Sequence, residues 1–77
     1  MNIIGYVICL NNSEYSASLE TLKIYPVIEP YINDPAKGYV RIIDESGEDY
    51  LYSDERFANI SLSPQVEKQV KKSLALA

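Results

Sequence analysis

The segment 39–52, with the sequence YVRIIDESGEDYLY, constrains the fold of this chain more than any other part of it. Two runs rich in β-branched and aromatic residues flank Ser46-Gly47. Such runs are typical of strands, and glycine readily adopts the positive φ that a tight hairpin turn requires. The sequence therefore predicts a β-hairpin with a two-residue loop at 46–47.

This loop length sets the register of the predicted hairpin. It pairs Ile42 with Leu51 and Ile43 with Tyr50, and residues paired across two strands share a face of the sheet. Val40 would join Ile42 and Leu51 in the core. The opposite face would lie largely outside the core and would carry Tyr39, Arg41, Ile43, Tyr50 and Tyr52.

Three other segments have the composition of strands. Residues 3–10 are β-branched and aromatic, 22–28 alternate in polarity, and 58–62 form a short last strand. Proline lacks the N–H that a central strand needs, and the segment 26–38 carries three prolines. We therefore predict that 22–28 is an edge strand that runs into a long loop.

The predicted connections between strands carry a few large side chains. We expect 14–21 to be a long loop and 53–57 to form a single helical turn. Long loops in small domains seldom stay empty of contacts. The side chains that we expect to fold back onto the body are Tyr15, Leu19, Tyr31, Ile32 and Phe57.

A C-terminal helix is predicted to begin at Ser63-Pro64. Serine suits the N-cap, proline suits the first helical position, and Glu67 and Lys71 form a favourable i,i+4 pair. We expect its apolar stripe to dock on the rest of the chain. The alternatives are pairing with a second copy in a homodimer and, as the weakest, contact with anionic lipid. The stripe consists of Val66, Val70, Leu74 and Ala77.

Parts of the chain also resemble a known group of sequences. The strings SLETLKIYPV at 18–27 and GYVRIIDESGEDYLY at 38–52, followed by Phe57, are similar to a family of short bacterial, often cyanobacterial, proteins that has no assigned function. The similarity extends over most of the chain before the predicted helix. One departure is Ser53, where many such sequences carry proline. The resemblance implies a fold and no particular chemistry.

The order of the predicted elements matches a known architecture. A strand, a long loop, a strand, a second loop, a hairpin, one helical turn and a short closing strand is the order of an SH3-like small barrel. We therefore predict a mainly β fold, with an SH3-like small β-barrel of about five strands at 1–63. The C-terminal α-helix would occupy 64–77.

Length and cysteine content limit the organisation of the chain. Seventy-seven residues are enough for one domain and too few for two. The single cysteine, Cys9, has no partner for an intramolecular disulfide. No secretory signal and no apolar run long enough to span a bilayer is visible. We expect a cytoplasmic protein without a membrane span.

The charge is distributed unevenly along the chain. Residues 1–63 carry 10 acidic and 4 basic side chains, for a net charge of −6, whereas 64–77 carry 3 basic and 1 acidic, for +2. An acidic body repels phosphate groups, so we do not expect nucleic acid as a partner.

Most catalytic equipment is absent from the sequence. There is no histidine, and a lone cysteine on a predicted strand is expected to be a buried, inert thiol. We therefore expect no enzyme, no cofactor and no metal site. Four carboxylates gather at the hairpin tip within 44–49 and would be solvated there; the alternatives are weak binding of a divalent cation and a carboxylate-based site.

The seven tyrosines are the feature that most suggests a binding surface. Tyrosine is enriched at protein interfaces, because it combines a rigid apolar ring with a polar tip. We predict a non-enzymatic interaction module that binds a protein or peptide through candidate residues Tyr15, Tyr39, Arg41, Tyr50, Tyr52 and Asp54. Two alternatives stay open: the tyrosines only cover the barrel, or the chain is a structural subunit that self-associates through the helix or the face of Tyr39, Ile43 and Tyr50.

Overall fold

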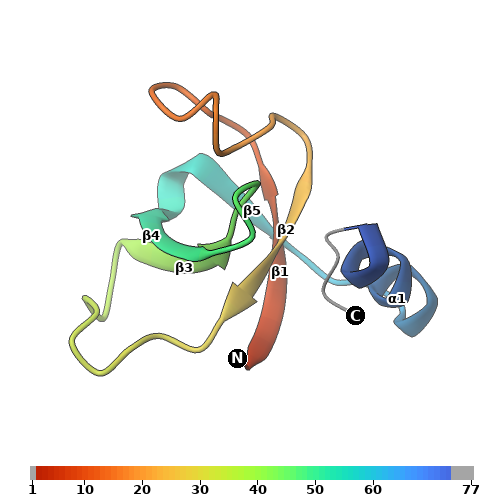
Figure 1. Cartoon of the computed structure of the whole chain (residues 1–77). Helices are drawn as coiled ribbons and strands as arrows, with labels where there is room; N and C mark the ends of the chain where they lie inside the picture. The colour runs from red at the N-terminus through yellow and green to blue at the C-terminus, as the bar shows by residue number, and fades with distance from the viewer. Residues whose placement is uncertain (1, 74–77) are drawn as a thin grey trace.

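The computed structural model of the chain describes residues 2–73 and contains one five-stranded antiparallel sheet followed by a helix (Figure 1). The strand order across the sheet is β4-β3-β2-β1-β5. This confirms the predicted mainly β class and the C-terminal helix. The elements are β1 (Ile3–Cys9), β2 (Ile24–Ile28), β3 (Tyr39–Ile43), β4 (Asp49–Ser53), the short 3-10 helix η1 (Asp54–Arg56), β5 (Phe57–Ile60) and α1 (Pro64–Ser73).

The β3–β4 hairpin is present, but the predicted register is wrong by one residue. Ile42 pairs with Tyr50, and Val40 pairs with Tyr52. The loop is one residue longer than predicted, because the main chain of Asp44 closes it by donating to the carbonyl of Glu48 at 3.1 Å. Gly47 takes the left-handed conformation inside this loop (φ 83°), as in a three-residue hairpin loop with a bulge.

The corrected register changes which side chains share a face. Tyr52 now lies on the same face as Ile42 and is buried, with only 5% of its surface exposed. Leu51, which we placed in the core, lies on the other face with Arg41. Ile43 is buried at 1% exposure, so the predicted assembly face that combined Ile43 with Tyr39 and Tyr50 does not exist.

Strand β2 is central in the sheet, so the prediction of an edge strand is also wrong. Cys9 donates from its main chain to the carbonyl of Lys23, and alternation along the ladder then turns the nitrogen of Pro26 towards β3. On that side the strands form a single bridge, between Val27 and Ile42. The missing N–H of Pro26 therefore faces β3, with which β2 pairs only at this bridge, and the hydrogen bonds between β2 and β1 are unaffected.

The core lies between the sheet and the long β1–β2 loop. Leu19 from that loop is fully buried, which confirms it as an anchor, and Phe57 is buried at the start of β5 as predicted. Burying an aliphatic or aromatic side chain of this size stabilises a fold by about 2 kcal/mol. The buried cluster consists of Val7, Cys9, Leu19, Tyr25, Ile42, Tyr52 and Phe57.

The β2–β3 loop is held on the sheet by Arg41. Its guanidinium makes two hydrogen bonds to the carboxylate of Asp34, at 2.8 and 2.9 Å, and one to Asp49 at 3.0 Å. The ring of Tyr31 lies 4.0 Å from the same guanidinium. Tyr31 therefore folds back as predicted, whereas Ile32 at 98% exposure does not.

Helix α1 begins as predicted. The hydroxyl of Ser63 accepts a hydrogen bond from the N–H of Val66 at 3.2 Å, and Lys71 lies 3.7 Å from Glu67. Figure 1 shows α1 at one end of the molecule and the β3–β4 hairpin at the other. Leu74 and Ala77 of the predicted stripe lie outside the described residues. No helix within 2–73 is long and apolar enough to cross a membrane.

Candidate functional site

A groove of about 580 Å³ lies between the β1–β2 loop and the β3–β4 hairpin. We call it the tyrosine groove. Its volume falls within the range of small-molecule and cofactor pockets, which are typically about 300–1,000 Å³. It is lined by Tyr15, Ala17, Ser18, Asp44, Ser46, Tyr50, Leu51 and Tyr52.

A buried hydrogen-bond network forms the inner wall of the groove. The hydroxyl of Tyr52 donates to the carboxylate of Asp44 at 2.6 Å and lies 3.0 Å from the hydroxyl of Ser18. The second carboxylate oxygen accepts bonds from the main chain and hydroxyl of Ser46, at 2.8 and 2.5 Å. The network thus joins the long loop, the hairpin turn and β4, and it fixes the inner wall of the groove.

Tyr52 is held in its neutral form in this wall. Burial and the hydrogen bond to the carboxylate of Asp44 raise the pKa of Tyr52 to about 12. The phenol therefore acts as a hydrogen-bond donor throughout the physiological pH range. Because its ring is buried, Tyr52 supports the groove and presents little surface to a partner.

Two tyrosines line the groove with exposed rings. Tyr15 is 43% exposed, and its ring meets Tyr52 edge to face, with centroids 5.0 Å apart. The guanidinium of Arg56 lies 4.7 Å from the ring of Tyr15 and donates to the carbonyl of Ser13 at 2.6 Å, so the loop is held at its base. Tyr50 is 49% exposed and is the most accessible aromatic side chain of β4.

Glu45 fastens the long loop to the hairpin tip beside the groove. Its main-chain N–H donates to the carbonyl of Ser18 at 2.9 Å, and its carboxylate accepts from Lys23 and from Tyr25. Burial raises the pKa of Glu45, but the hydrogen bonds from Lys23 and Tyr25 together outweigh it and leave that pKa lowered. The two sides of the groove are therefore tied together and preorganised.

The four carboxylates of the hairpin do not gather at one site. Asp44 turns inward to Tyr52, Glu45 turns to Lys23 and Tyr25, and Asp49 turns to Arg41 on the other face. Within the described part of the chain, no group of three or more carboxylates, cysteines or histidines is arranged to hold a metal ion. Three of the four carboxylates therefore have partners of their own inside the protein.

The structure divides the predicted binding residues among three places. Tyr15, Tyr50 and Tyr52 meet at the tyrosine groove. Tyr39 and Arg41 line a separate depression of about 310 Å³ under the β2–β3 loop. Asp54 lies in η1, where its main chain donates to the carbonyl of Gly38 at 3.0 Å.

Arg41 has a structural role in this second depression. Its side chain is only 13% exposed, and both of its carboxylate partners are mostly buried. The hydrogen bond to Asp34, partly opposed by burial, raises the pKa of Arg41 above its ordinary value. The register turns the side chains of Arg41 and Tyr52 to opposite faces of the hairpin, and Arg41 stacks on Tyr31.

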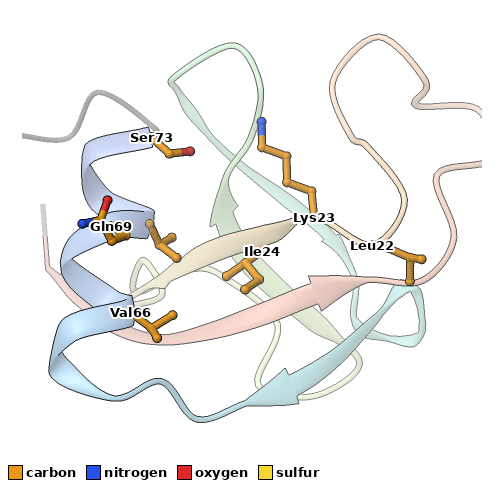
Figure 2. Close-up of a pocket in the computed structure, with 7 residues that line it drawn as sticks. Leu22, Lys23, Ile24, Val66, Gln69 and Ser73 are labelled. Carbon is orange, nitrogen blue, oxygen red and sulfur yellow. The ribbon is translucent and has the colours of Figure 1, made fainter.

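A third depression, of about 360 Å³, separates α1 from the start of β2 (Figure 2). Figure 2 shows the side chains of Val66 and Ile24 in the space between helix and strand, with Leu22 further along. Leu22 is 69% exposed and Val66 is 43% exposed. This depression is apolar and lacks a charged group apart from Lys23 among its lining residues.

Sequence reasoning missed several residues of the groove. Asp44 was assigned to a solvated tip, although an aspartate two residues before a serine in a turn often hydrogen-bonds that serine's main chain. Ser18 and Ala17 gave no sequence signal, because the long loop brings them to the hairpin only in three dimensions. Cys9 is fully buried, and burial raises the pKa of its thiol, so it offers no nucleophile.

No known family model, no curated protein and no solved structure matches this chain.

Proposed function

We propose that this chain is a non-enzymatic interaction module that binds a segment of a partner protein in the tyrosine groove. The proposal rests on one observation: the half-exposed rings of Tyr15 and Tyr50 line a groove whose inner wall is preorganised. Tyrosine is favoured at binding sites because it gives a large contact area at a low cost in conformational entropy. A rigid groove avoids the entropy cost of ordering a site during binding.

Charge favours a partner segment with a basic residue. Of the four basic residues in 1–63, Lys23 and Arg41 are ion-paired within the described structure. Glu48 lies exposed at the hairpin turn, and Glu14, also exposed, precedes Tyr15. These carboxylates favour a lysine or arginine of the partner and would increase the rate of association.

The absence of enzymatic activity is part of the same proposal. The one carboxylate of the groove, Asp44, and the hydroxyls of Ser18, Ser46 and Tyr52 already have hydrogen-bond partners inside the protein. A general acid or base needs a group that is free to exchange a proton with a substrate. The chemistry of the lining residues therefore suits recognition.

We also infer that the sheet curls into an SH3-like small barrel. The support is the strand order, in which β1 pairs with both β2 and β5, and the position of η1 between β4 and β5. In small barrels of this kind, long loops flank the binding surface. The β1–β2 loop has this place in the present chain.

The proposal is tested with a random library of linear dodecapeptides panned against the full chain. The affinity of an enriched peptide is then measured by calorimetry for the wild type, Tyr50→Ala and Tyr39→Ala. Tyr39 is the matched control, because it is 52% exposed but lines the other depression. We expect Tyr50→Ala to weaken binding about tenfold or more, as for interface hot spots, and Tyr39→Ala to leave it within about twofold.

Two outcomes would contradict the proposal. One is a library that yields no peptide with measurable affinity. The other is equal binding by the wild type and Tyr50→Ala. Thermal unfolding of both variants shows whether a loss of binding comes from a loss of structure; half-exposed side chains should cost less than about 1 kcal/mol in stability.

A structural subunit that self-associates is the second candidate function. It is favoured by the exposed apolar side chains Leu22 and Val66 beside the α1–β2 depression. A second copy of the chain would cover these side chains. Sedimentation velocity at micromolar concentration tests this: a dimer that Leu22→Lys dissociates supports it, and a monomer at all concentrations excludes it.

A further inference from the structure

Strand β4 is at the end of the sheet and has only one neighbour. In the order β4-β3-β2-β1-β5 it pairs with β3 alone. An edge strand presents main-chain N–H and C=O groups that no other strand satisfies. Such an edge is a template for the addition of a further strand.

The hydrogen-bond pattern shows which main-chain groups face outward. Asp44 and Glu48 form a hydrogen-bonded pair at the turn, and this pairing alternates along an antiparallel ladder. Tyr50 and Tyr52 therefore direct their main-chain groups towards β3. The N–H and C=O of Leu51, between them, point away from β3 at the outer edge.

The outer edge at Leu51 opens into the tyrosine groove. Tyr50, Leu51 and Tyr52 all line the groove, and Tyr15 and Ser18 of the long loop line its other side. None of the loop, turn and side-chain hydrogen bonds within residues 2–73 involves the main chain of Leu51. The groove thus places an unsatisfied donor and acceptor next to a space of about 580 Å³.

We propose that the partner segment binds in an extended conformation and adds to the sheet as a strand beside β4, exchanging two main-chain hydrogen bonds with Leu51. The inference rests on the proposed function and specifies its binding mode. Side chains of the added strand alternate in direction, so every second one would contact Tyr50 and Tyr15. A lysine or arginine near one end would meet the carboxylate of Glu48, which is not ion-paired within 2–73.

The added strand is a segment of a different protein and carries a basic residue. A second copy of this chain fits less well, because each copy carries a net charge of −4 and the hairpin is acidic. A proline-rich segment would bind by packing its rings on the tyrosines and would leave the Leu51 groups unsatisfied. These occupants are alternative outcomes of the test.

The test uses the dodecapeptide selected from the library, with its main-chain amides N-methylated one at a time. Only one edge of an added strand can form hydrogen bonds with β4, so the effect of N-methylation on affinity should differ between neighbouring amides of the peptide. We expect methylation of the one peptide amide that donates to the carbonyl of Leu51 to weaken binding about tenfold or more. Methylation of the amides on either side of it should change binding by less than about threefold.

The protein side of the contact is tested at Leu51. Leu51→Pro removes the outward N–H, and edge strands tolerate proline at such positions, whereas Leu51→Val keeps the N–H. We expect Leu51→Pro to weaken binding about tenfold and Leu51→Val to change it by less than threefold. Hydrogen exchange of the Leu51 amide in the wild type tests the same bond without a substitution. We expect saturating peptide to slow this exchange about tenfold or more.

The outcomes separate this inference from the proposed function. Uniform insensitivity to N-methylation, or an unchanged exchange rate at Leu51, overturns strand addition even if Tyr50→Ala still weakens binding. A selected peptide that is rich in proline overturns it in the same way. If no peptide binds at all, the proposed function fails and this inference fails with it.

Discussion

The phenol of Tyr52 donates a 2.6 Å hydrogen bond to the carboxylate of Asp44, and both side chains are at least 95% buried. A buried carboxylate without a cation is costly unless hydrogen bonds satisfy it. Here the bonds from Tyr52 and Ser46 supply that satisfaction, and Ser18 extends the network to the long loop. This contact therefore determines how the loop and the hairpin together form the groove.

Replacing Tyr52 by phenylalanine should destabilise the fold. Tyr52→Phe keeps the ring in the core but removes the donor to Asp44, which leaves a buried carboxylate oxygen unsatisfied. We expect the free energy of unfolding to fall by about 2 kcal/mol, measured by urea denaturation at pH 7. Ser46→Ala provides a comparison on the other carboxylate oxygen. An unchanged stability of Tyr52→Phe would show that the network is not formed.

Stability should decline at alkaline pH because of the same phenol. The pKa of Tyr52 is about 12 in the folded chain and near 10 when unfolded, so its contribution is complete below pH 10. The contribution is lost as the pH rises from 10 to 12 and amounts to roughly 2–3 kcal/mol. Urea denaturation between pH 9 and 12 should show a shallower decline for Tyr52→Phe. The residual decline reflects Tyr25, whose pKa is also raised by burial. Identical declines in the two proteins would contradict the assignment.

For the β3–β4 hairpin, the sequence correctly predicted the two strands but not their register. Alternation and the glycine correctly indicated two paired strands within 39–52, and Ser63-Pro64 correctly indicated the helix start. The register depended on a loop that was one residue longer than expected, because Asp44 stabilises it with its own main chain and carboxylate. A shift of one residue exchanges every side chain between the faces, and this moved Tyr52 into the core.

The rest of the candidate site depends on contacts between distant residues. Ser18 and Tyr52 meet across 34 positions of sequence, so no local pattern indicates their contact. Pro26 indicated an edge strand, because proline is normally excluded from central strands. Here its missing N–H faces β3, where β2 and β3 form only a single bridge. The exposed tyrosines of the groove were predicted as binding residues; their common site was not.

Arg41→Gln should release the β2–β3 loop and lower stability. The variant leaves the carboxylates of Asp34 and Asp49 mostly buried without a cation. We expect the free energy of unfolding at pH 7 to fall, because removing one partner of a largely buried ion pair leaves the other without its compensating charge. Lys37→Gln is the control; it removes one positive charge from the same loop without breaking an ion pair of the described structure.

Arg41→Gln should also change how stability depends on pH in the acid range. The hydrogen bond from Arg41 lowers the pKa of Asp34, and the bonds from Tyr31 and then Arg41 lower the pKa of Asp49. Carboxyls with lowered pKa stabilise the fold above their unfolded pKa values, and this stabilisation is lost as the pH falls through the folded values. Wild-type stability should therefore drop more steeply below about pH 4 than that of Arg41→Gln. A parallel drop would contradict the ion pairs.

The thiol of Cys9 should be protected in the folded chain. It is fully buried, and burial raises its pKa, so both access and thiolate formation are suppressed. We expect it to react with a disulfide reagent at pH 8 roughly a hundredfold or more slowly than in denaturant, because reaction requires opening of the fold. Equal rates in the two conditions would place Cys9 outside the core.

Chemical-shift mapping locates the bound peptide on the surface of the chain. Amide chemical shifts of the labelled full chain are recorded during titration with the library-selected peptide. We predict that the largest changes occur at residues 15–18 and 44–52, with small changes at 30–41 and in α1. Changes concentrated under the β2–β3 loop or along α1, with the groove residues unaffected, would contradict the assignment of the binding site to the tyrosine groove.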